Sequence, residues 1–202
     1  FVTVTIPLSH TYIIHLGTYN GENPYKDSNS LIRASDEAVN YYLSRRWDIR
    51  YCVYDGERSM GTSRYKNNLS RKGIQCIALP KGSKAQRVER KIGTLKSRGR
   101  TTKTSCQYSL PHSFVPHLVE NTRVMINNDC SDGNVDSAPP QRLLDGNEPI
   151  DYNVTFAAPF GSYCVVSKMG ESNKAKDVAF HGIYLYPMET KEEGYNFYRL
   201  DT

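Results

Sequence analysis

The pattern of apolar and polar positions divides the first half of the chain into alternating strands and helices. Residues 1–6 and 11–16 are rich in β-branched and aromatic residues, which predicts a β-hairpin. A helix is predicted to begin at Ser28 or Ser30 and to end near Arg46, because its apolar residues recur at helical spacing. These apolar residues are Leu31, Ala34, Ala38 and Tyr42.

The same alternation continues beyond this helix. Residues 49–54 form a predicted strand that stops at the turn signal Asp55-Gly56, and a helical stretch then runs to Lys72. Residues 74–79 are the next predicted strand. A further helix begins near Ala85, with one apolar seam made by Val88, Ile92 and Leu95. The order of these elements predicts an α/β fold.

The second half of the chain changes character. Another helix is predicted over 111–127, and the stretch 128–151 is rich in Asp, Gly and Pro, as is typical of a linker or a long loop. Short strands are predicted after it, at 160–166, 179–186 and 195–200. We therefore expect a domain over 1–127, a linker over 128–151 and a small β-barrel-like module over 152–202.

Composition and charge narrow the classes of function. The chain has 202 residues, of which 38% are apolar, yet it has no apolar run near the roughly 18 residues of a membrane-spanning helix. The net charge is +5, but nine basic residues lie between Lys81 and Lys103 with Glu89 as the one acid among them. The rest of the chain is therefore net acidic. Such a concentrated charge indicates either a surface for a phosphate backbone or a solvated basic face.

The cysteines and histidines do not form a zinc site by their spacing. The five cysteines lie at least 24 residues apart, and His112 and His117 do not share a helical face. Scattered thiols and the lack of a secretory signal before the strand that begins at Phe1 favour an intracellular protein with reduced cysteines. The start within a strand also favours a piece of a longer protein.

Two acids are the candidates for chemistry. Asp55 follows a strand, where α/β folds place functional side chains, and Glu89 lies 34 positions later within the basic helix. Taken singly, Asp55 is explained as a turn residue before glycine, and Glu89 as a partner in a helix-surface ion pair. Taken together, they match the layout in which phosphoryl-transfer enzymes hold divalent metals beside a phosphate.

Four short segments in this order carry a family resemblance. They are Asp55-Gly56-Glu57, Lys72-Gly73-Ile74, Pro80-Lys81-Gly82 and Val88-Glu89-Arg90-Lys91-Ile92-Gly93-Thr94-Leu95-Lys96. The region resembles the catalytic core of a retroviral-type integrase from a copia-like retrotransposon polyprotein. Residues 160–161, 182–185 and 194–195 are similar to later parts of such polyproteins. The resemblance implies an RNase H-like mixed sheet flanked by helices over 1–127, followed by an SH3-like β module.

The resemblance also implies a function. Asp55 and Glu89 would be catalytic acids that bind Mg²⁺ or Mn²⁺ during 3′-end processing of DNA and strand transfer, which is DNA integration by transesterification. DNA, both element ends and target, would be the partner of a homo-oligomer located in the nucleus or in a retroelement particle. The expected DNA-binding residues are Lys84, Arg87, Arg90, Lys91, Lys96, Arg98 and Arg100.

Two departures from the family pattern keep other functions open. No acid occurs before Glu22, so the first acid of the D-D-E triad is expected upstream of Phe1, and the chain by itself is expected to be inactive. Gly93 stands where retroviral relatives have a DNA-contacting lysine. The alternatives are a catalytically inactive DNA-binding relative of integrase and an RNase H-fold nuclease.

Overall fold

The chain forms two compact units. In the computed structural model, unit 1 comprises Phe1–Thr94 and Asp129–Asn147, and unit 2 comprises Leu95–Asn128 and Glu148–Thr202. The domain limits expected from the sequence stay predictions. The structure describes residues 2–4, 9–14, 28–55, 59–80, 85–129, 138–146, 151, 155–167, 179–188 and 194–200.

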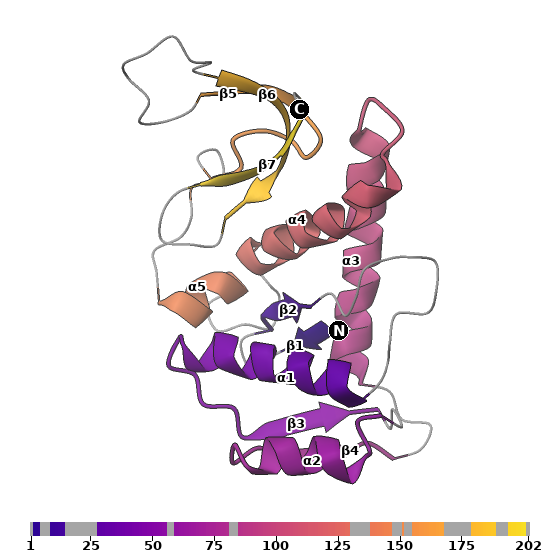
Figure 1. The fold of residues 1–202 in the computed structure, drawn as a ribbon, viewed down its shortest axis with the longest axis vertical. Helices are drawn as coiled ribbons and strands as arrows, with labels where there is room; N and C mark the ends of the chain where they lie inside the picture. The colour runs from indigo at the N-terminus through magenta and orange to yellow at the C-terminus, as the bar shows by residue number, and fades with distance from the viewer. Residues whose placement is uncertain are drawn as a thin grey trace. The chain divides into compact units, whose positions relative to one another are not determined.

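Unit 1 contains two pairs of strands and the helices that cover them (Figure 1). Strands β1 and β2 pair antiparallel, and β3 and β4 pair parallel with Cys52 opposite Cys76. The elements are β1 (Val2–Val4), β2 (Thr11–Ile13), α1 (Ser28–Leu43), β3 (Tyr51–Tyr54), α2 (Ser63–Ser70), β4 (Gln75–Ala78), the first half of α3 (Gln86–Ser105) and α5 (Pro140–Asp145). The predicted hairpin, helices and strands are therefore present.

Helices α1 and α2 cover one face of the β3–β4 pair. Tyr65 and Leu69 of α2 are almost fully buried and pack with Leu31 of α1 and with Cys52 and Cys76 of the strands. The opposite face of the pair is apolar but open, since Tyr51, Val53 and Ile77 are exposed. The side-chain alternation of the two strands thus separates a packed face from an uncovered one.

Helix α1 is buried on a second side as well. Ala34 and Ala38 pack against Ile14, which directly follows β2, and Tyr42 packs against Leu144 of α5. The buried His10 ring lies within hydrogen-bond distance of the Tyr42 hydroxyl, 3.1 Å from its Nδ1. Helix α1 therefore holds β2 and α5 in addition to β3 and β4.

Helix α5 lies within the segment that the sequence predicts to be a linker or loop. Its last residue, Asp145, accepts a hydrogen bond from Arg45 Nε at 2.9 Å, and Leu144 accepts one at its carbonyl oxygen from Trp47 Nε1 at 2.8 Å. Gly146 ends the helix in the left-handed conformation, with φ of 68°. Six residues of this stretch are thus docked on the end of α1.

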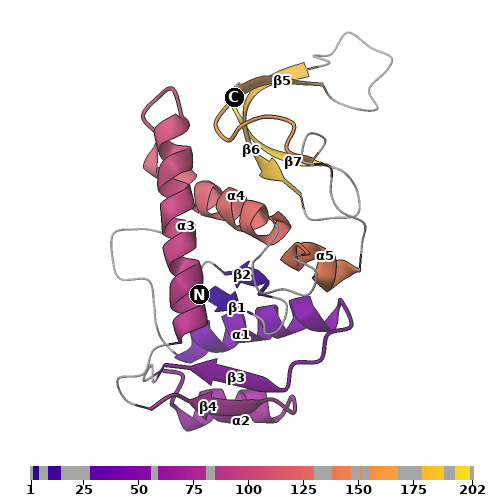
Figure 2. The ribbon, with the colours of Figure 1, turned by 180° about the vertical axis from the view of Figure 1, so that it is seen from behind.

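Unit 2 is built from helices and a three-stranded antiparallel sheet in the order β5–β6–β7. Its core joins Phe114 and Leu118 to Leu185 of the sheet. The elements are the second half of α3, η1 (His112–Phe114), α4 (Val115–Asn128), β5 (Tyr163–Ser167), β6 (Ala179–Pro187) and β7 (Tyr195–Arg199). Figure 2 shows β5, β6 and β7 from behind.

The α/β class predicted from the sequence is confirmed. The described residues contain both pairings that a mixed sheet combines, but they form three small separate sheets. An RNase H-like mixed sheet and an SH3-like module therefore stay predictions. No described helix is both long enough and apolar enough to cross a bilayer.

Two glycines should respond to alanine with opposite signs. Gly73 has φ of 75°, so Gly73→Ala should lower the free energy of unfolding by about 1 kcal/mol. Gly93 lies inside α3, and no heavy atom lies within 4 Å of where its Cβ would stand, so Gly93→Ala should raise that energy by up to about 1 kcal/mol. Urea unfolding followed by circular dichroism measures both free energies of unfolding. Changes of the same sign in the two variants would contradict the backbone conformations described for Gly73 and Gly93.

Candidate active site and nucleic-acid interface

Asp55 lies at the carboxyl end of the parallel strand pair. The preceding residue, Tyr54, is buried, and its carbonyl oxygen accepts a hydrogen bond from the backbone N–H of Leu79 at 2.8 Å. The next residue along the strand faces the other way, which leaves Asp55 exposed. Its carboxylate makes no hydrogen bond or ion pair with a described residue, so the structure holds it open to solvent.

Glu89 lies in the first turn of α3 and is exposed. The residues three and four positions away along the helix are Ala85, Gln86, Ile92 and Gly93, and none of them is basic. The ion pair along the helix that would explain Glu89 structurally therefore has no partner there. The helix N-terminus favours a carboxylate at this place, although the carboxylate meets no charged partner among the described residues.

The two carboxylates belong to the same unit but not to a larger cluster of metal ligands. In both ribbon views the carboxyl end of β3 points to the end of unit 1 at which α3 begins (Figures 1 and 2). Within the described residues, no group of three or more His, Cys, Asp or Glu side chains could hold a metal ion. The structure therefore provides a pair of open carboxylates, and the third acid of a triad is not among the residues it describes.

The face of α3 that carries Glu89 is otherwise basic. Lys96, Arg100 and Lys103 follow Glu89 at seven, eleven and fourteen positions, and this spacing returns to the same side of an α-helix. All three side chains are exposed. We call Glu89, Lys96, Arg100 and Lys103 the Glu89 face. Lys103 is absent from the set predicted from the sequence, although its spacing from Glu89 could have identified it.

The other predicted DNA-binding residues are arranged differently. Arg87 and Arg90 are exposed on other sides of α3. Lys91 and Arg98 are half-buried and already have interaction partners, so they are less available to a ligand. Lys84 lies outside the described residues. The predicted DNA-binding residues of α3 therefore differ in helix side and in burial, although their charges are the same.

The described cysteines and His10 do not suggest a second type of chemistry. Burial raises the pKa of the Cys52, Cys76 and Cys106 thiols, which keeps them protonated and weakly nucleophilic at neutral pH. His10 is fully buried, with its Nε2 3.0 Å from Gln141 Oε1, and serves the core as a polar packing residue.

Solved structures share this fold. No protein-family model matches the chain, and no curated protein does. A simian T-cell lymphotropic virus intasome in complex with PP2A regulatory subunit B56 gamma matches with a TM-score of 0.55 and 12% identity, covering 96% of this chain and 68% of that one. The HTLV-2 integrase catalytic core domain in complex with magnesium matches with a TM-score of 0.51 and 13% identity, over 70% of this chain and 80% of that one.

A third match is the catalytic core domain of BIV integrase, with a TM-score of 0.49 and 15% identity, covering 71% of this chain and 82% of that one. At such identities the two matches with the higher TM-scores establish similarity of fold alone. About 70% of the chain is therefore similar in fold to a retroviral integrase catalytic core.

The faces of α3 should differ in their effect on DNA binding. Lys96→Gln/Arg100→Gln removes two charges from the Glu89 face, and Arg87→Gln/Arg90→Gln removes two from other sides of the same helix. We expect the first pair to lower the salt-dependence slope of duplex binding by about two, since each lost phosphate contact removes about 0.9. The second pair should change it less. Equal losses in a fluorescence titration at several salt concentrations would indicate a diffuse basic surface instead.

Proposed function

We propose that this chain carries two of the three acidic ligands of an integrase-like polynucleotidyl transferase and holds DNA along the Glu89 face of α3. The observation that carries the proposal is Glu89 itself. It is an exposed acid with no ion-pair partner among the described residues, on a helix face whose other charged side chains are cations. The cations of this face suit a phosphate backbone, and the open carboxylate suits a metal ion.

The donor set fits a magnesium ion that shares its coordination with substrate. Mg²⁺ is commonly bound through one or two carboxylates together with waters and substrate phosphates. Asp55 and Glu89 are two open carboxylates, so they would hold such an ion and leave its remaining positions to DNA. The match to an integrase core solved with magnesium supports this choice of metal for the proposal.

The residues of this chain then have separate tasks. A divalent cation at this site would stabilise the charge that develops on phosphate oxygens during transesterification. Lys96, Arg100 and Lys103, on the same face of α3 as Glu89, would hold the DNA backbone by neutralising phosphates. The expected outcome is 3′-end processing and strand transfer once a third acid completes the site. A homo-oligomer, a retrotransposon origin and a nuclear or particle location are parts of the same proposal.

A second candidate is a relative of integrase that binds DNA without chemistry. It is favoured by one observation, namely that no group of three or more metal-ligating side chains occurs among the described residues. The two candidates differ in whether Asp55 and Glu89 bind a cation.

Radical cleavage with Fe²⁺ should map the metal site without requiring catalysis. Fe²⁺ binds oxygen ligands and, with ascorbate and peroxide, cuts the polypeptide next to its own site. We expect cuts near Asp55 and Glu89 that excess Mg²⁺ suppresses and that Asp55→Asn removes. Asp48→Asn, at an exposed acid paired with Arg50, is the matched control and should leave the cuts in place. Cuts at other places, or no cuts, would support the second candidate, a relative of integrase that binds DNA without catalysis.

Glu89→Gln should preserve DNA binding or tighten it, because it removes a negative charge from a surface that faces phosphates. The 202-residue chain should join no labelled terminal DNA to a target duplex in Mg²⁺ or Mn²⁺, because no group of three or more metal-ligating side chains occurs among its described residues. A gel assay that separates cut from joined products measures this. Efficient joining would show that this chain itself supplies every acid the reaction needs, and cutting without joining would support the nuclease.

A further inference from the structure

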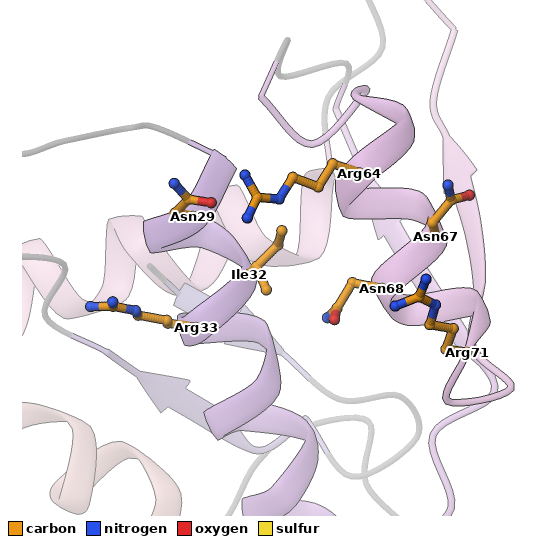
Figure 3. A pocket seen from close by; sticks show the side chains of 7 residues that line it. All are labelled: Asn29, Ile32, Arg33, Arg64, Asn67, Asn68 and Arg71. Atoms are coloured by element: carbon orange, nitrogen blue, oxygen red, sulfur yellow. The ribbon is translucent and has the colours of Figure 1, made fainter.

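A cavity of about 850 Å³ lies between α1 and α2, and neither Asp55 nor Glu89 is among its lining residues. Figure 3 shows Arg64 reaching from α2 toward Asn29 of α1, with Ile32 and Asn68 turned into the space between the helices. We call this the α1–α2 pocket. Its lining residues are Asn29, Ile32, Arg33, Arg64, Asn67, Asn68 and Arg71.

The charge of the α1–α2 pocket is not balanced from within the described structure. Arg33, Arg64 and Arg71 are exposed and make no side-chain hydrogen bond or ion pair with a described residue. Asp36 of α1, which contacts the lining residue Asn68, is bound at 2.7 Å by both Lys72 Nζ and Asn68 Nδ2. That carboxylate is already neutralised by lysine, so the three guanidinium groups stay available to an anion.

Helix stability does not explain the position of Arg64. Neither α1 nor α2 has an acidic residue in its first turn, and Arg64 occupies the first turn of α2. A positive charge at that end opposes the helix dipole and costs a few tenths of a kcal/mol or more. An anion bound between the helix starts would offset both the dipole and the arginine charge.

We propose that the α1–α2 pocket binds the phosphate backbone of nucleic acid as a second contact surface, apart from the Glu89 face. Arg64 and Arg71 lie seven residues apart, about 10 Å along a helix, so their guanidinium groups can neutralise different phosphates of one backbone. The amides of Asn29 and Asn67 add neutral donors for phosphate or sugar oxygens, whereas the Asn68 amide already donates to Asp36. The choice of DNA as the nucleic acid rests on the function proposed above.

An acidic protein is the competing occupant, and the lining argues against it. Protein interfaces draw most of their affinity from aromatic or aliphatic anchors that fill pockets. Ile32 is the one apolar residue of this lining, and the other lining residues are arginine and asparagine. Arginine and asparagine side chains donate hydrogen bonds to phosphate oxygens, which a nucleic-acid backbone presents at regular intervals. Such a lining therefore suits a nucleic-acid backbone better than it suits a folded protein surface.

The test compares two double variants of the 202-residue chain that remove the same charge. Arg64→Gln/Arg71→Gln empties the pocket of two guanidinium groups. Arg50→Gln/Lys66→Gln removes two exposed charges of unit 1 that do not line it. Binding of a fluorescent mixed-sequence duplex is titrated at several salt concentrations, with a glutamate-rich peptide as a second probe.

The pocket pair should lower duplex affinity on the order of tenfold or more at 0.1 M salt and reduce the salt slope by about two, whereas the control pair changes both much less. Equal effects of the two pairs would overturn the proposal. Arginine-dependent binding of the peptide at higher affinity than duplex would also overturn it, in favour of an acidic protein.

The same titrations separate this proposal from the one for α3. If the pocket pair weakens binding while Lys96→Gln/Arg100→Gln does not, the α1–α2 pocket stands and the Glu89 face fails as a DNA surface. If only the α3 pair weakens binding, the pocket is excluded and the proposed function is unaffected. Additive losses from both pairs would support two separate surfaces.

Discussion

The burial of α1 on two sides is the interaction on which unit 1 depends. Leu31 joins it to α2 and the parallel strands, while Ala34, Ala38 and Tyr42 join it to β2 and α5. A pair of strands alone is at best marginally stable in water, and unit 1 contains two such pairs. The helix therefore supplies the packing that strand pairing does not, and it also forms one wall of the α1–α2 pocket.

Local signals in the sequence predicted most of the elements of the fold. Helical spacing located α1, and the helical stretch expected to run to Lys72 is present as α2, followed by Gly73 with a positive φ before β4. Helix α5 was not predicted because its surroundings are rich in turn residues. Pro140 at its start and Gly146 at its end are nevertheless ordinary helix boundary signals that could have identified it.

The candidate site was predictable only in part, for a physical reason. Asp55 could be identified because it follows a predicted strand. Glu89 could be identified because it is the one acid in a segment of basic residues. The arginines of the α1–α2 pocket have no such signal in the sequence. Arg33 and Arg71 belong to elements far apart in sequence, and the sequence around each is that of an ordinary solvent-exposed helix face. A site formed between two helices is visible only once their packing brings the faces together.

Helix α3 has no buried residue along its 20 positions, and this bears on the stability of the helix as well as on ligand binding. Lys96 and Arg100 are four residues apart, and Arg100 and Lys103 three, so like charges are neighbours on one face and each pair opposes helix formation by a few tenths of a kcal/mol. Little packing offsets this repulsion. A polyanion laid along the face would remove it, so the order of this helix and the occupation of its surface are thermodynamically coupled, with dissolved salt acting as a weak substitute for the ligand.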